Sequence, residues 1–208
     1  MADGIAEVSM HSRARATGII YLLYFLTAIF GQLLLSRRVA GFGLGVSLLG
    51  TAFYVVLALL FYWLFKPVNK NLSLLAALIS LAGCVVTALA QLHFAFEHVS
   101  PLIFFGPYCL LIGYLILRSD FLPRFLGVLM ILAGLGWLIA LCLPKKSHLV
   151  PYIEGLGILA EGLLMLWLIL LGVNEQRWQT GAAAASARSA ASKPAPLPGD
   201  APNNPSLR

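Results

Sequence analysis

Residues 104–138 read FFGPYCLLIGYLILRSDFLPRFLGVLMILAGLGWL. Two long apolar runs flank one short polar segment, RSDFLPR, at residues 118–124. About 20 apolar residues cross roughly 30 Å of hydrocarbon as a helix, and a short turn makes consecutive helices antiparallel neighbours. This stretch therefore predicts a helical hairpin inside a membrane.

The same pattern continues in both directions along the chain. Apolar residues make up 60% of the sequence and charged residues only 11%, whereas a soluble domain carries about a quarter charged residues. We predict an all-α membrane protein, a six-transmembrane-helix bundle that occupies residues 16–174. The predicted spans lie at about 16–35, 42–65, 72–93, 101–117, 125–143 and 152–173.

Lys and Arg are divided unequally between the two ends of this bundle. Ten lie at the end that carries both termini: Arg13, Arg15, Lys66, Lys70, Arg118, Arg124, Arg177, Arg188, Lys193 and Arg208. Four lie at the other end: Arg37, Arg38, Lys145 and Lys146. Because basic residues are retained on the cytoplasmic side during insertion, we predict that the N and C termini are both cytoplasmic.

The two terminal segments differ from the bundle in composition. Residues 1–15 are predicted to be a short cytoplasmic N-terminal segment. Residues 175–208 are rich in Ala, Ser, Pro and Gly without hydrophobic periodicity, and we expect a disordered cytoplasmic tail. Trp178, next to Arg177, is expected at the level of the lipid headgroups.

The net charge of +6 is explained by basic residues at helix ends beside anionic lipids. The expected partner is thus the lipid bilayer and not a nucleic acid, while a homo-oligomer and a small-molecule or ion ligand are left open. Cys84, Cys109 and Cys142 show no metal or redox spacing. No cofactor is expected.

Glycines recur seven residues apart in three predicted helices. Seven residues are nearly two helical turns, so each pair lies on one helix face, where small residues let two backbones approach closely in lipid. We interpret these residues as helix-packing positions: Gly106 and Gly113, Gly127 and Gly134, Gly155 and Gly162.

Glu161 lies near the middle of the last predicted span, where a charged residue costs roughly 2.5 to 3.5 kcal/mol on insertion. Such a carboxyl should face the bundle interior and be hydrogen-bonded. It is either a proton or cation site or a structural group bonded to a neighbouring helix. Glu154, on the same face, and Gln91 and Gln32, near the same end of the bundle, complete a candidate intramembrane polar site.

A weaker candidate is a metal site. His93 and Glu97 are four residues apart, which would stack two ligands on one helix face. A third ligand would have to come from Glu154 or His98, and no metal-enzyme motif joins these residues. The sequence also lacks a recognisable catalytic motif, so no catalytic residue is assigned and an enzyme is not the expected class.

The chain resembles a bacterial membrane family, domain of unknown function 4386. The resemblance rests on residues 104–138 and on ARATGIIYLLYFLTAIFG, LLFYWLFKPVNKNLSLLAAL and ILAEGLLMLWLILLGVN. It implies a six-helix protein of the inner, cytoplasmic membrane and no particular reaction.

Three hypotheses remain at this stage. The first is a non-enzymatic multi-pass membrane protein held together by close helix packing. The second is a small secondary transporter or proton-coupled carrier that uses Glu161, with Gln32 and Gln91 shaping a polar cavity. The third is an intramembrane metal protein or enzyme that uses His93, Glu97 and Glu154.

Overall fold

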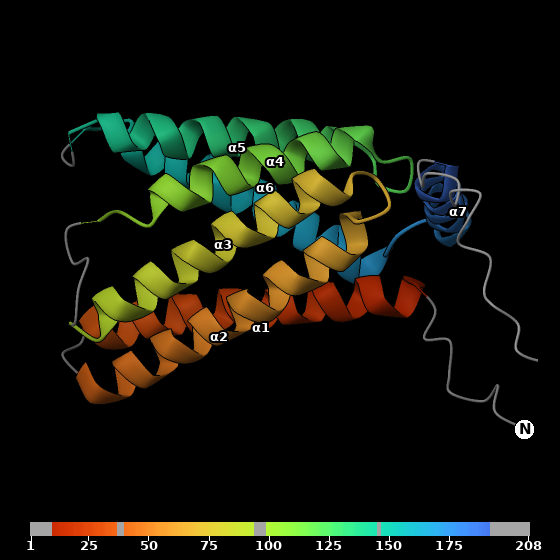
Figure 1. Ribbon diagram of the computed structural model, residues 1–208. Helices are drawn as coiled ribbons and strands as arrows, with labels where there is room; N and C mark the ends of the chain where they lie inside the picture. Colours follow the sequence, from red (N-terminus) through yellow and green to blue (C-terminus); the bar gives the residue numbers. More distant parts are fainter. Residues whose placement is uncertain (1–9, 37–39, 94–98, 145–146, 192–208) are drawn as a thin grey trace, which may run out of the picture.

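The computed structural model describes residues 10–36, 40–93, 99–144 and 147–191, and its regular secondary structure is helical throughout this part of the chain (Figure 1). The all-α prediction is thereby confirmed for these residues. The helices are α1 (Met10–Ser36), α2 (Ala40–Phe65), α3 (Lys70–Gln91), α4 (Leu102–Arg118), α5 (Arg124–Cys142), α6 (Val150–Leu170) and α7 (Glu175–Ala191).

Helices α1 to α6 occupy the positions of the six predicted spans. Five of them (α1, α2, α3, α5 and α6) are long and apolar enough to cross a membrane, while α4 is apolar but shorter, at 17 residues. Helix α1 begins at Met10 and not near residue 16, because the helix continues past the apolar run through Arg13 and Arg15.

The first six helices form a ring. Each contacts the next one in chain order, and α6 returns to contact α1. The helices run side by side along one direction, with α7 and the start of α1 at one end of the bundle (Figure 1). We call this end the α7 end; the opposite end, where α1 stops and α2, α4 and α6 begin, is the far end.

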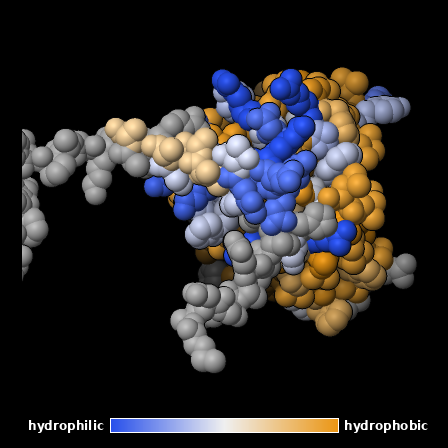
Figure 2. All heavy atoms as spheres, turned by 90° about the vertical axis from the view of Figure 1, so that its right-hand side faces the viewer, coloured by the Kyte–Doolittle hydropathy of each residue, from blue (hydrophilic) through white to orange (hydrophobic). Residues whose placement is uncertain are grey.

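The outer surface of the ring is apolar. Each of α1 to α6 exposes large hydrophobic side chains: Ile19, Trp63, Val85, Ile103, Ile139 and Leu170 are examples. Viewed from the α7 end, polar side chains gather on the end face, and apolar side chains cover much of the flank (Figure 2). An apolar flank between polar ends suits a hydrocarbon environment.

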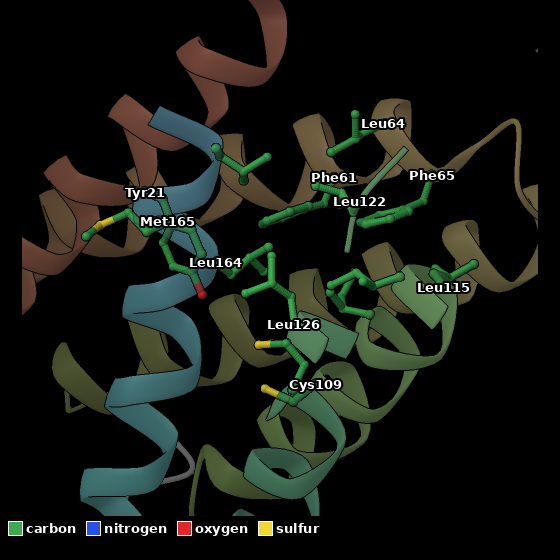
Figure 3. Close-up of a cluster of buried hydrophobic side chains, with 14 of the residues drawn as sticks. Tyr21, Phe61, Leu64, Phe65, Cys109, Leu115, Leu122, Leu126, Leu164 and Met165 are labelled. Atoms are coloured by element: carbon green, nitrogen blue, oxygen red, sulfur yellow. The ribbon is translucent and has the colours of Figure 1, made fainter. Parts of the chain in front are cut away.

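The interior of the ring is closely packed near the α7 end. Phe61 and Phe65 of α2 stack with their ring centroids 6.0 Å apart, and Leu126 and Leu164 are fully buried near them (Figure 3). Phe121, from the α4–α5 turn, adds a ring 5.9 Å from Phe65. These side chains form an apolar plug that closes this end of the ring.

Two of the three predicted glycine pairs lie at a close contact between α4 and α5. A Cβ atom at Gly113 would lie 2.8 Å from the carbonyl oxygen of Gly127, and one at Gly134 would lie 2.8 Å from that of Gly106. Only residues without a side chain fit at this separation.

The third pair differs from the sequence interpretation. A Cβ atom at Gly155 or Gly162 would meet no atom within 4 Å among the described residues. The seven-residue spacing put both glycines on one face, but neither position is a close contact with another helix of the described chain.

The prediction of a disordered tail is wrong for residues 175–191, which form α7. Alanine favours helix strongly, and the Asn174 side chain caps the helix by accepting a hydrogen bond from the Arg177 amide at 3.1 Å. The Trp178 indole N–H donates to the Leu64 carbonyl oxygen at 3.0 Å. Helix α7 is therefore attached to the end of α2; residues 192–208 lie outside the described residues.

Gly134→Ala should destabilise the protein by about 1–3 kcal/mol, because the added methyl group overpacks the α4–α5 contact. The matched control is Gly162→Ala, which adds the same methyl group where space is open and should be neutral or slightly stabilising. Thermal unfolding of the purified variants in detergent checks both. Equal effects of the two substitutions would contradict this account of the glycines.

Candidate ligand-binding cavity

Glu161 lies at the centre of α6, about 15 Å along the axis from either end of the helix. Its side chain points into the ring and is only 4% exposed. The Tyr21 hydroxyl of α1 donates a hydrogen bond to its Oε2 atom at 2.9 Å. Tyr21 is the one hydrogen-bond partner of Glu161 within the described part of the chain, so the carboxyl group keeps further acceptor capacity.

Tyr21 is held in place by other aromatic rings. Its ring centroid lies 5.4 Å from that of Phe25 and 5.9 Å from that of Phe61, the latter in an edge-to-face arrangement. Three residues earlier, Gly18 lets α1 approach α6 closely, since a Cβ atom there would lie 2.8 Å from the Ile169 backbone nitrogen. The position of the Tyr21 hydroxyl thus follows from packing on both sides of α1.

A cavity of about 620 Å³ occupies the half of the ring nearest the far end. Glu161 lies at its inner end, and all six helices of the ring contribute to its wall. The lining residues Ile29, Gln32, Pro101 and Ile158 are exposed and form its rim. This volume is in the range of sites for small organic molecules, roughly 300–1,000 Å³.

Aromatic side chains make up much of the wall. The Tyr54 ring is the centre of the group, with its centroid 4.7 Å from Tyr24 and 6.0 Å from both Phe105 and Tyr108. Phe105 in turn lies 5.7 Å from Trp137. We call these five residues the aromatic wall.

The cavity also contains polar atoms that lack partners. Four lining residues carry a buried polar atom without a hydrogen bond in the described structure: Tyr54 Oη, Ser80 Oγ, Tyr108 Oη and Trp137 Nε1. Buried polar groups in folded proteins are nearly always hydrogen-bonded, and each exception calls for an explanation. Here, all four atoms belong to residues that line one cavity, although the atoms themselves are covered by neighbouring protein atoms.

Trp137 owes its position to a glycine on the neighbouring helix. Its indole ring fills the volume where a side chain of residue 157 would lie, with Cε2 only 2.7 Å from the place of a Cβ atom on Gly157. The small residue between Glu154 and Glu161 therefore makes room for the aromatic wall.

The structure brings together two of the four residues of the predicted polar site. Glu161 and Gln32 line the same cavity. Gln91 is not among the lining residues, although its Oε1 atom is buried and unpartnered among the described residues. Glu154 is exposed at the start of α6 and likewise does not line the cavity.

The geometry assumed for the metal site is absent at His93. Helix α3 ends at Gln91, and His93 has a left-handed backbone conformation with φ of 56°. A four-residue helical spacing therefore does not apply there, and Glu97 lies outside the described residues. No group of three His, Cys, Asp or Glu side chains suited to a metal ion occurs in the ranges that the structure describes.

Neither Tyr21 nor any residue of the aromatic wall was predicted from the sequence as part of the site. One signal was present: Tyr21, Tyr24, Tyr54 and Tyr108 lie well inside their helices, whereas membrane tyrosines are usually concentrated at the interfaces. A tyrosine inside a span needs a partner for its hydroxyl, just as Glu161 needs one for its carboxyl group.

The apolar helices and their apolar flank define the chain as a multi-pass integral membrane protein. The family model described as Domain of unknown function (DUF4386) matches residues 84–172. The chain is 34% identical to an uncharacterised protein of Archaeoglobus fulgidus over 124 residues, which are 57% of this chain and 76% of that protein. The chain belongs to the DUF4386 family. No solved structure matches it.

Tyr21→Phe should lower the stability by about 1–3 kcal/mol, because it leaves a buried carboxyl group without its hydrogen-bond donor. The control is Tyr114→Phe, which removes an exposed hydroxyl that accepts a bond from Arg118 Nε at 3.0 Å and should change stability by less than about 0.5 kcal/mol. Thermal unfolding in detergent measures both, and a Tyr21→Phe variant as stable as the control would refute the structural importance of this bond.

Proposed function

We propose that this protein is a small secondary carrier that binds its cargo in the cavity, with Glu161 at the binding end. The observation that carries the proposal is a cavity of about 620 Å³ that is lined by all six helices of the ring and ends at an intramembrane carboxyl group. Ionisable residues that face a cavity inside a membrane protein mark substrate and ion pathways.

The asymmetry of the ring supports a carrier. The far half of the ring is hollow and has an exposed rim, while the α7 half is closed by the apolar plug around Phe65. This is the arrangement of a carrier open to one side. Transport then requires a second arrangement, in which the plug separates and the far half closes around the cargo.

We further infer that all six helices of the ring span the inner membrane, with both termini in the cytoplasm. Helix α4 runs alongside α5, so the two share one depth although α4 is shorter. The α7 end carries Lys66 over the Trp63 ring at 4.7 Å and Arg118 over the Tyr114 ring at 5.5 Å. Basic and aromatic side chains together are typical of a membrane interface, and excess basic charge is typical of the cytoplasmic one.

Reporter fusions check this topology. Alkaline phosphatase, which is active only outside the cytoplasm, should be inactive when fused after Arg208 and active when inserted between Lys145 and Lys146. A fluorescent protein that folds only in the cytoplasm should give the reverse result. Active phosphatase at Arg208 would place the α7 end outside and overturn the orientation.

The native cysteines provide a direct test of the carrier. Cys84 lines the cavity, whereas Cys109 is 0% exposed and does not. A variant that keeps only Cys84 (Cys109→Ala, Cys142→Ala) should react with a membrane-impermeant thiol reagent. The matched variant that keeps only Cys109 (Cys84→Ala, Cys142→Ala) should remain unlabelled.

The side from which the reagent acts distinguishes a carrier from a one-sided binding protein. If the ring alternates, Cys84 should react in intact cells and also in inverted membrane vesicles. Reaction from one side alone would argue for a receptor-like pocket. Complete protection of Cys84 in folded protein would overturn the cavity proposal and leave Glu161 as a structural carboxyl group bonded to Tyr21.

A further inference from the structure

The charge of the cavity restricts the class of its ligand. Glu161 is the one acidic residue among the described lining residues, and none of these is Lys, Arg or His. No ion pair of Glu161 is found in the described ranges either. A carboxylate enclosed in protein at mid-membrane is best stabilised by a positive charge, and the lining side chains do not supply one.

The aromatic wall favours the same kind of ligand. Aromatic faces attract a cation that lies within about 6 Å of the ring centroid, most strongly where water is excluded. Tyr24 and Tyr108 belong to the wall and line the same cavity as Glu161. A positive centre bound in this cavity would therefore have the carboxylate and several aromatic rings as its neighbours.

The remaining features describe the rest of the ligand. Ser80, Tyr54, Tyr108 and Trp137 add polar groups to the wall, but their hydroxyl and indole N–H groups are covered by neighbouring protein atoms. The rim carries the exposed apolar side chains of Ile29 and Ile158. A ligand with an apolar body and one cationic nitrogen suits the carboxylate, the aromatic wall and this rim.

We propose that the cavity binds a monovalent organic cation, an amine or quaternary ammonium compound with an apolar body. The positive centre lies between the Glu161 carboxylate and the aromatic wall, and the body extends toward the rim. This assignment rests on the proposed function, since it names the cargo class of the same cavity.

The experiment uses the variant that retains only Cys84 and compares two thiol reagents of similar size and opposite charge. These are the trimethylammonium-ethyl and the sulfonato-ethyl methanethiosulfonates. The rate at which each reagent labels Cys84 is divided by the rate at which the same reagent reacts with a small thiol in water. The cationic reagent should be favoured by more than about tenfold, since attraction to an unpaired carboxylate in a partly desolvated site is worth at least that factor and the aromatic rings add to it.

Three substitutions in the variant that keeps only Cys84 test whether Glu161 causes the preference for the cationic reagent. Glu161→Gln can still accept the bond from Tyr21 and should reduce the preference about tenfold, which leaves only the contribution of the aromatic rings. Glu161→Asp keeps the charge and should retain most of the preference. Glu154→Gln removes the other carboxyl group of α6, which lies outside the cavity, and should leave the preference unchanged.

A second measurement does not depend on a substitution at Glu161. Tetraphenylphosphonium and tetraphenylborate have the same shape and opposite charge. The phosphonium ion should slow the labelling of Cys84 by at least about tenfold at saturation, while the borate ion should not.

The outcomes separate the two proposals. Labelling of Cys84 by both reagents at equal normalised rates, or a preference that Glu161→Gln leaves undiminished, would overturn the cation assignment and leave the carrier standing. Protection of Cys84 from both reagents in folded protein would overturn the carrier itself, and with it the cavity as a binding site.

Discussion

The hydrogen bond between Tyr21 and Glu161 is the interaction on which the rest of the arrangement depends. A carboxyl group at the middle of a membrane helix cannot face the hydrocarbon, so it must face the protein interior and find its partners there. The donor comes from α1 and the acceptor from α6, the first and last members of the ring. The bond therefore joins the two ends of the six-helix chain and closes the ring around its interior.

Closing the ring leaves an interior that the side chains fill unequally. Toward the α7 end, Phe61, Phe65 and the leucines around them are almost completely buried. Toward the far end, tyrosines and Trp137 line a wall and leave a space between them. Glu161 therefore lies at the boundary between a packed half and a hollow half.

Helix length and apolar composition were enough to predict the six apolar helices, because twenty apolar residues between charged turns have few other stable arrangements. The same reasoning identified Glu161, since one carboxyl group in an apolar run stands out. It failed for residues 175–191, where alanine content was interpreted as disorder, although Asn174 and Trp178 fix a helix to α2. It failed again at His93, where a helix was assumed to continue beyond Gln91.

What the sequence by itself determined is the membrane class, the placement of the apolar helices and the presence of a carboxyl group that must face inward. These follow from local composition and the cost of polar groups in lipid. Only the tertiary structure decided that Tyr21 is the partner of Glu161 and that Gln32, but not Glu154, lines the same cavity as Glu161. It also decided that Gly155 and Gly162 are not close contacts with another helix of the described chain. Such relations depend on the rotation and separation of helices distant in sequence, and residue spacing within one helix carries no information about them.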